Sequence, residues 1–205
     1  ITVVGKRDGS FQWDRKVGEV DFGPDAERYY YEVADRWFTA WLKGDKRGLE
    51  EWPRVELFGM GANRWRSEDD WPLARARYTD FYLHSKGSAN TPAGDGLLSR
   101  DAPSEEPPDR YAYDPRDPVM TLYTPPGQHE PQDQRRLDGR PDVLVYATPP
   151  LEREIEVTGP VTLKLWAATS ARDTDFTAKL IDVWPNGFAQ ELSYGIVRAR
   201  YRDSF

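Results

Sequence analysis

The chain has 205 residues, of which 38% are hydrophobic and 13% aromatic, and its 28 Lys and Arg against 35 Asp and Glu give a net charge of −7. This length suits one domain, or one domain and part of another, and the acidic balance argues against a general nucleic-acid binder or a protein that adheres to anionic membranes. The absence of Cys excludes disulfides and a cysteine nucleophile, and two His exclude a histidine-rich metal site.

The first 50 residues predict a strand, a loop and a helix. Residues 1–4 are all β-branched and indicate the end of a strand, and the polar residues 6–20 predict a loop. Gly23-Pro24-Asp25 indicates the start of a helix and Lys43-Gly44 its stop. Between them, apolar side chains recur at helical spacing at Tyr30, Val33, Ala34, Trp37, Phe38 and Trp41. This wide aromatic stripe predicts a helix that lies against a sheet or another domain.

After residue 50 the apolar pattern changes to period two, which is typical of strands. Strands are predicted over residues 55–60, 78–85, 142–148, 161–167, 176–181 and 196–201. Gly159-Pro160 and Pro185-Asn186-Gly187 indicate turns between some of them. Ten of the 17 prolines lie in residues 86–141, which predicts a long wrapping loop with short strands, for instance around Gly96-Leu97-Leu98. The pattern favours an antiparallel sandwich or jelly roll.

No motif identifies a reaction from the residues alone. There is no Gly-x-Ser-x-Gly nucleophile elbow, and Ser10 and Ser88 are expected to be turn residues. His84 is expected to be a partly buried strand residue, and His129 an exposed residue of a proline-rich loop. A histidine-based triad within this chain is therefore not expected.

Two acidic clusters and two tryptophans are the remaining candidates for a site. Glu68-Asp69-Asp70 and Asp173-Thr174-Asp175 have the carboxylates that bind calcium or transfer protons, but solvated loop acids or turn caps explain them as well. The string Asn63-Arg64-Trp65-Arg66 and Trp71 are suited to stacking on a sugar or an aromatic group. The alternative is Trp packing at the edge of a β domain, with Arg laid over it.

Short motifs follow one another in a specific order from about residue 17 to the end of the chain. They are Val20-Asp21-Phe22-Gly23-Pro24, Arg36-Trp37-Phe38, Trp41-Leu42-Lys43-Gly44, Met60-Gly61-Ala62-Asn63-Arg64-Trp65-Arg66, Trp71-Pro72, Phe81-Tyr82-Leu83-His84-Ser85, Tyr113-Asp114-Pro115, Asp117-Pro118-Val119, Asp133-Gln134-Arg135, Asp142-Val143-Leu144-Val145-Tyr146, Glu156-Val157-Thr158-Gly159-Pro160-Val161, Asp173-Thr174-Asp175-Phe176, Ala178-Lys179-Leu180 and Arg198-Ala199-Arg200-Tyr201-Arg202. This ordered combination resembles the C-terminal part of the cocaine esterase/X-Pro dipeptidyl-peptidase family, the CocE/NonD hydrolases.

The resemblance implies a mainly β fold: a jelly-roll β-sandwich, incomplete here, preceded by the last strand and helix of an α/β-hydrolase domain. Residues 1–50 would be the end of the hydrolase domain and residues 51–205 the C-terminal jelly-roll domain. Members of the family carry a Ser-His-Asp triad and cleave acyl esters, amides or peptide bonds after proline. The chain would then be the C-terminal portion of a longer serine hydrolase, in which it forms a structural wall beside the substrate.

One departure from the family concerns the catalytic histidine, which stands there in a Gly-Pro-Trp-x-His-Gly stretch just ahead of the final helix. The matching place reads Gly5-Lys6-Arg7-Asp8-Gly9. An altered first segment, a missing loop and a catalytically degenerate member each explain this. No catalytic, substrate-binding or metal-binding residue is therefore assigned, and no cofactor is expected.

The expected partners are a small ester, amide or peptide substrate and the remainder of the hydrolase chain, with no nucleic acid and no membrane; a homo-oligomer is also compatible with the sequence. An alternative function is a non-catalytic jelly-roll module that binds carbohydrate through Trp65, Trp71 and Asp175. A third is a domain that fixes the state of assembly.

Overall fold

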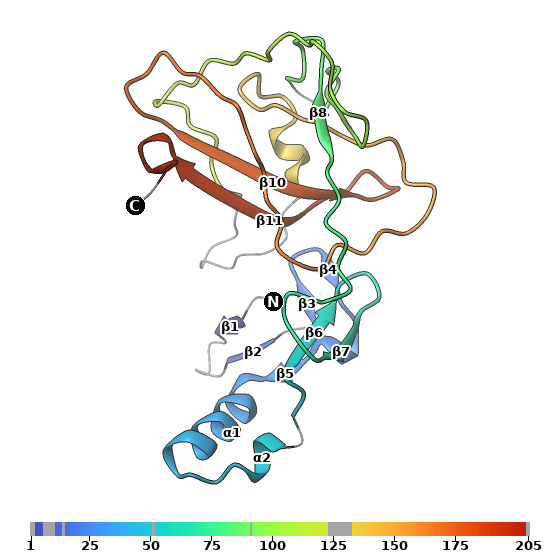
Figure 1. Ribbon diagram of the computed structural model, residues 1–205, viewed down its shortest axis with the longest axis vertical. Coiled ribbons are helices and arrows are strands. Elements are labelled where there is room, and N and C mark those ends of the chain that lie inside the picture. The colour runs from blue at the N-terminus through green and yellow to red at the C-terminus, as the bar shows by residue number, and fades with distance from the viewer. Residues whose placement is uncertain are drawn as a thin grey trace. The chain divides into compact units, whose positions relative to one another are not determined.

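The computed structural model describes residues 3–5, 11–13, 15–50, 52–90, 92–122 and 133–203, and only the backbone at 3–5, 11–13 and 28–30. These residues divide into two units, one up to Ala76 and the other from Arg77 onward. Strands outnumber helices in the described part of each unit (Figure 1). The prediction of a mainly β chain is therefore confirmed.

The first unit begins with short antiparallel strands. The central strand β2 (Phe11–Trp13) pairs with β1 (Val3–Gly5) and β5 (Arg28–Tyr29), and β3 (Lys16–Val17) pairs with β4 (Val20–Asp21). The loop predicted over residues 6–20 is therefore wrong in its described part. Strands of two or three residues are too short to show a period-two pattern, so the polar composition alone decided that prediction.

Helix α1 (Tyr30–Leu42) begins later than its predicted start at Pro24. Pro24 opens a short 3-10 turn, η1 (Pro24–Ala26), which ends because Glu27 is extended, with φ −68° and ψ 128°. The following two residues pair with β2 as strand β5, so the helix starts only at Tyr30. The predicted stop is confirmed, since α1 ends at Leu42 and Gly44 has a φ of 74°.

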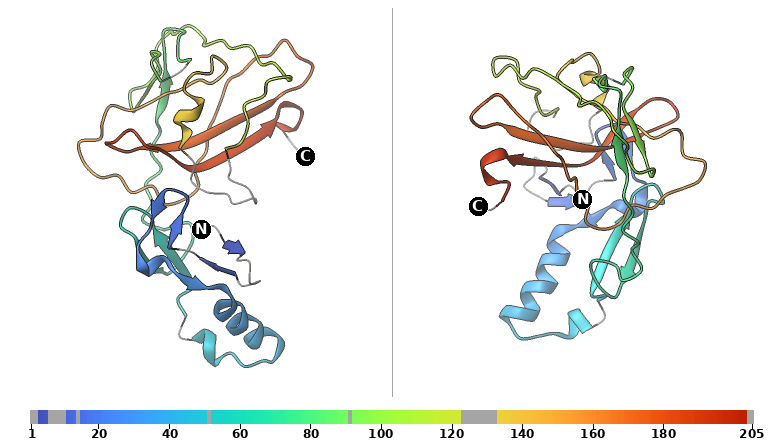
Figure 2. Two further views of the ribbon diagram at one scale, coloured as in Figure 1. Left: turned by 180° about the vertical axis from the view of Figure 1, so that it is seen from behind. Right: turned by 45° about the horizontal axis from the view of Figure 1, so that its top comes forward.

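The aromatic stripe of α1 is mostly uncovered among the described residues. Ala40, at one edge of the stripe, is buried, whereas Trp37, Phe38 and Trp41 are each more than half exposed. The short helix α2 (Arg47–Glu50) lies beside α1 (Figure 2), and the Arg36 guanidinium lies 5.5 Å from the centre of the Trp52 ring. This contact is on the polar flank of α1 and leaves the aromatic side chains exposed.

A hairpin of β6 (Val55–Gly59) and β7 (Arg64–Glu68) completes the first unit. The sequence predicts β6 correctly but not β7, because the string Arg-Trp-Arg-Ser-Glu has no apolar alternation. The turn is specified by Asn63, which has a φ of 50° and accepts a hydrogen bond of 3.1 Å from the N–H of Gly61. Among the described side chains of this unit, the buried apolar ones are Val17, Val20, Ala26, Ala40 and Leu73.

The described residues of the second unit form two antiparallel ladders of two strands. Strand β8 (Tyr82–His84) pairs with β9 (Leu97–Ser99), and β10 (Asp175–Val183) pairs with β11 (Ala189–Arg198). The latter pair forms the long hairpin in orange and red in Figure 1, flanked by the 3-10 turns η2 (Gln134–Leu137) and η3 (Ala199–Tyr201). Its turn lies where the sequence predicts it, and Gly187 there has a φ of 85°.

Two of the predicted strands are absent from the described part of the second unit. Residues 142–148 form only isolated bridges at Leu144 and Ala147, and residues 161–167 pair with no described strand. The alternation over 161–167 would bury one face of a strand, but Val161, Leu163 and Trp166 are all exposed. The last strand also ends earlier than predicted, at Arg198, where η3 begins. The incomplete jelly roll stays a prediction.

Several loops are fastened by carboxylates that bond to an arginine two residues later, which we call Asp-x-Arg turns. Asp45, Asp114 and Asp133 accept hydrogen bonds of 3.2, 2.9 and 3.1 Å from the backbone N–H groups of Arg47, Arg116 and Arg135. The same guanidinium groups donate to the same carboxylates. These bonds lower the pKa of Asp45 and of Asp133 to about 2. The turns therefore stay ionised and closed over a wide pH range.

Candidate functional site

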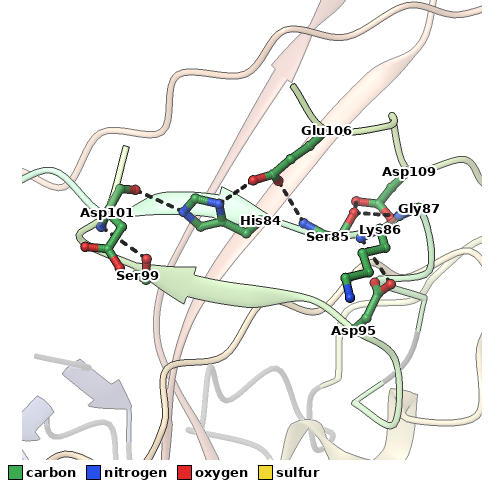
Figure 3. A network of polar contacts seen from close by, with 9 residues as sticks. All are labelled: His84, Ser85, Lys86, Gly87, Asp95, Ser99, Asp101, Glu106 and Asp109. Atoms are coloured by element: carbon green, nitrogen blue, oxygen red, sulfur yellow. Dashed lines mark hydrogen bonds and ion pairs between the residues drawn. The ribbon is translucent and has the colours of Figure 1, made fainter. Parts of the chain in front are cut away.

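The most connected group of polar side chains in the described residues lies around the end of β8 (Figure 3). Strand β8 presents His84, and Ser85 follows it. The proline-containing segment 101–109, which has no regular secondary structure, passes beside them and contributes Glu106 and Asp109. We call this group the β8 network.

The His84 ring bonds to the segment through both nitrogens. Its Nδ1 lies 2.7 Å from Oε1 of Glu106, and its Nε2 lies 3.0 Å from the carbonyl oxygen of Asp101. The hydrogen bond to Glu106 is the main cause that raises the pKa of His84 above its ordinary value of 6.5, although partial burial opposes it. The same bond lowers the pKa of Glu106, whose Oε2 also accepts a hydrogen bond of 3.1 Å from the N–H of Ser85.

Asp109 is the second centre of the β8 network. Its carboxylate accepts hydrogen bonds of 2.6 Å from the Ser85 hydroxyl, 2.6 Å from the Tyr146 hydroxyl and 2.9 Å from the Ala89 N–H. Burial favours the neutral form of Asp109, but these three donors outweigh it and lower the pKa of Asp109. Burial and the bond to this carboxylate raise the pKa of Tyr146 well above its ordinary value.

The β8 network lacks the arrangement that activates a serine nucleophile. Activation requires a hydrogen bond from the serine hydroxyl to a general base, with a third group that orients the base. The Ser85 hydroxyl instead donates to Asp109, while both nitrogens of His84 are bonded to the segment 101–109. Neighbouring residues of an extended chain point to opposite sides, which keeps the two side chains apart (Figure 3). The hydrogen bonds of the network join the end of β8 to the segment 101–109.

The tryptophans proposed as a stacking surface differ in their surroundings. The Nε1 of Trp65 donates a hydrogen bond of 2.7 Å to the carbonyl oxygen of Asp25, and its ring meets Phe58 at 5.4 Å between ring centres. Phe58 in turn packs edge-on against Phe22. Trp65 is therefore part of a half-buried aromatic cluster of the first unit, whereas Trp71 is exposed.

The acidic clusters are paired with arginines. Glu68 forms an ion pair of 2.9 Å with Arg66 and a hydrogen bond of 2.6 Å with Arg75. Asp175 pairs with Arg198 at 2.8 Å across the β10–β11 ladder, and Asp173 pairs with Arg200. Across the described ranges no group of three His, Asp or Glu residues is placed to hold a metal ion. The alternative of structural turn acids fits these contacts better than calcium binding.

The remaining sequence candidates fall into two groups. Ser88 lies in a loop, where its N–H donates to Asp95 at 3.2 Å, as expected of a turn serine. Ser10, His129 and the stretch that matches the family's histidine loop, residues 6–9, lie outside the described residues. None of the helices described in the structure is long and apolar enough to cross a membrane.

Sequence reasoning missed Glu106, Asp109 and Tyr146, which hold the β8 network together. The first two lie in the proline-rich stretch, where no periodic pattern marks a buried contact, and Tyr146 was expected on a strand. The only available signal is composition: an acidic pair three residues apart, in a loop too long to be structureless in a compact unit.

Comparisons with known proteins place these observations in a family. A family described as the X-Pro dipeptidyl-peptidase C-terminal non-catalytic domain matches residues 47–205. Cocaine esterase from Rhodococcus sp. (strain MB1 Bresler) is 46% identical over 195 residues, which cover 93% of this chain and 34% of the esterase. The crystal structure of an aminopeptidase from the marine sediment archaeon Thaumarchaeota archaeon is 31% identical, with a TM-score of 0.71, and the match covers 93% of this chain and 32% of that one.

The chain thus spans about a third of the length of these two relatives. The family match extends over most of the chain, from α2 to its last residue. The chain therefore belongs to the X-Pro dipeptidyl-peptidase C-terminal domain family, and is a C-terminal portion of the cocaine esterase and X-Pro peptidase type.

Proposed function

We propose that this chain is the non-catalytic C-terminal portion of a serine hydrolase that cleaves acyl ester or amide bonds, peptide bonds after proline included. Residues 1–50 end the α/β-hydrolase domain, and residues 51–205 form a jelly-roll domain. The observation that carries this proposal is the match of residues 47–205 to a domain described as non-catalytic. The names of the two relatives, an esterase and an aminopeptidase, support a reaction at an acyl carbon.

In this proposal the chemistry belongs to the upstream part of the polypeptide. A serine there attacks the carbonyl carbon, a histidine transfers its proton, and backbone N–H groups stabilise the oxyanion. The residues of this chain contribute a wall beside the substrate and keep the hydrolase domain in shape. The β8 network suits that role, because it joins a strand to a long loop through fixed hydrogen bonds.

The exposed stripe of α1 supports a covalently linked partner for the first unit. Trp37, Phe38 and Trp41 are exposed on consecutive turns of one helix face. Burying each large side chain stabilises a protein by about 1.5–3 kcal/mol, so an uncovered stripe of this kind favours a packed neighbour. The neighbour proposed here is the sheet of the hydrolase domain, which precedes this chain in the polypeptide.

The carbohydrate-binding alternative has weaker support. It needs Trp65 and Trp71 to present free ring faces, but Trp65 already packs against Phe58 and bonds to Asp25. Asp175, the third residue invoked, is bonded to Arg198. An assembly role is a separate alternative, and it predicts that the oligomeric state of the longer protein, measured by sedimentation, changes when this chain is removed.

The proposal is tested by comparing the chain with the longer polypeptide that contains it. The longer protein should hydrolyse a p-nitrophenyl ester and the 205-residue chain should not. The chain alone should bind a hydrophobic dye at the α1 stripe, and Trp41→Ser should reduce that binding, whereas Tyr78→Ser, at another exposed aromatic residue, should not. Ester hydrolysis by the chain alone, or a longer protein that lacks hydrolase activity, would overturn the proposal.

A further inference from the structure

The His84 ring faces two hydrogen-bond acceptors. One is the Glu106 carboxylate and the other is the Asp101 carbonyl oxygen. A neutral imidazole has one N–H group and one lone pair, so it can satisfy only one of these acceptors and turns its lone pair towards the other. The imidazolium ion has two N–H groups and satisfies both. The geometry therefore selects the doubly protonated ring.

The contacts of this ring hold a segment that the sheets do not hold. Segment 101–109 adds no strand to β8 or β9, and each of its hydrogen bonds to them described here involves a side chain. At one end Asp101 meets His84, and in the middle Glu106 meets His84 and the Ser85 N–H. At the other end Asp109 meets the Ser85 hydroxyl. His84 thus takes part in the attachments at Asp101 and Glu106 (Figure 3), while the Asp101 N–H also donates to the Ser99 hydroxyl at 3.1 Å and Asp109 is held without His84.

We propose that His84 is a proton-operated clasp that fastens segment 101–109 to strand β8 while its ring carries two protons and loosens the segment when the ring becomes neutral. This inference is independent of the hydrolase activity of the longer protein. It assigns a conformational role to a histidine that lies outside any catalytic arrangement.

The charged groups around the ring favour the closed form. From the segment, Glu106 and Asp101 face the ring, and Asp109 lies beyond Ser85. Strand β9 contributes the uncharged Ser99, and the neighbouring loop contributes Asp95, which accepts from the N–H of Lys86. Carboxylates therefore outnumber cations among the described neighbours of the imidazolium ion.

The pH range of the clasp follows from the two pKa shifts. The pKa of His84 is raised, so its contribution is fully present below 6.5 and is lost as the pH rises through the folded value. The pKa of Glu106 is lowered, so its contribution is present above 4.5 and is lost as the pH falls through the folded value. The clasp is therefore closed between pH 4.5 and pH 6.5, and it opens as the pH rises through the folded pKa of His84.

Trypsin provides a direct test, because Arg100 precedes the segment and is exposed. The rate of cleavage after Arg100, followed by mass spectrometry, is compared between Glu106→Gln and the unchanged chain at about pH 6.5 and about pH 9. The ratio of the two rates cancels the pH dependence of trypsin itself. Glu105→Gln, at the adjacent exposed carboxylate, is the matched control.

At the lower pH, Glu106→Gln should be cut roughly 2- to 10-fold faster than the unchanged chain, the range expected for one hydrogen bond. At the higher pH the ratio should approach one, and Glu105→Gln should give a ratio near one throughout. NMR measures the pKa of the His84 ring directly, and comparison with His129→Asn assigns its signals. The pKa of His84 should lie above 6.5 in the unchanged chain and should fall in Glu106→Gln. A ratio that does not change with pH, or a His84 ring that titrates at or below 6.5, would overturn the proposal.

Discussion

Replacing Gly96 by alanine probes the closest approach of another backbone segment to a described glycine of the second unit. A Cβ atom at Gly96 would lie 1.9 Å from the carbonyl oxygen of Val145, whereas ordinary contact begins at 3.4 Å. The two backbone segments would have to part by about 1.5 Å. That movement would break three hydrogen bonds: Val145 N–H to Ala89 at 2.8 Å, Leu98 N–H to Ala147 at 3.0 Å and Ala147 N–H to Gly96 at 3.3 Å.

At roughly 0.5–1.5 kcal/mol for each hydrogen bond, Gly96→Ala should destabilise the second unit by about 3 kcal/mol. Urea unfolding followed by circular dichroism measures this loss, and amide exchange at Leu98 and Ala147 locates it. Gly139→Ala is the matched control, because a Cβ there meets no atom within 4 Å. A loss below about 1 kcal/mol for Gly96→Ala, or equal losses for the two variants, would refute the close approach.

Three further substitutions test separate parts of the structure. Trp65→Phe keeps the aromatic packing but removes the hydrogen bond to Asp25, and should cost about 1 kcal/mol in urea unfolding; no loss would mean that this bond does not form. Phe188→Ala empties a buried site beside Trp184 and should lower the free energy of unfolding by about 3–5 kcal/mol. Val183→Ala, at an exposed position on the same hairpin, should lower it by less than about 0.5 kcal/mol. Similar losses for the two variants would contradict the burial of Phe188. Because the pKa of Asp109 is lowered on folding, ionised Asp109 stabilises the fold above pH 3.8, and this stabilisation is lost as the pH falls through the folded pKa. Asp109→Asn should therefore be less stable than the unchanged chain at neutral pH, and its stability should fall less steeply in acid. An equally steep fall in acid would count against this role of Asp109.

The sequence predicts correctly those elements whose boundaries depend on the residues of the element itself. The start of β6, the β10–β11 turn at Asn186 and Gly187, and the end of α1 before Gly44 all rest on local chemistry, which acts wherever the segment lies in the fold. The helix start was misread because proline suits the first position of a 3-10 turn as well as that of an α-helix. Only the pairing of β5 with β2, a tertiary contact, decides between the two.

The β8 network could not be predicted from the sequence, because it depends on tertiary contacts. The side chain of His84 was correctly expected near a strand, but its partners come from a loop that lacks any periodic pattern. The alternation at Val161, Leu163 and Leu165 is a real strand signal, yet a strand also needs a neighbour that supplies hydrogen bonds. The described residues offer none there, and the segment stays unpaired.

The Asp-x-Arg turns have a consequence for the order of folding. Each turn joins residues only two positions apart. Closing such a short loop costs little chain entropy, and it is the closure of long loops that slows folding. Asp133 belongs to one of these turns and also accepts a hydrogen bond of 3.3 Å from the N–H of Ala189, 56 residues away. We expect the local turn to orient this carboxylate before β11 docks, so that a short-range contact prepares the docking point for a long-range one.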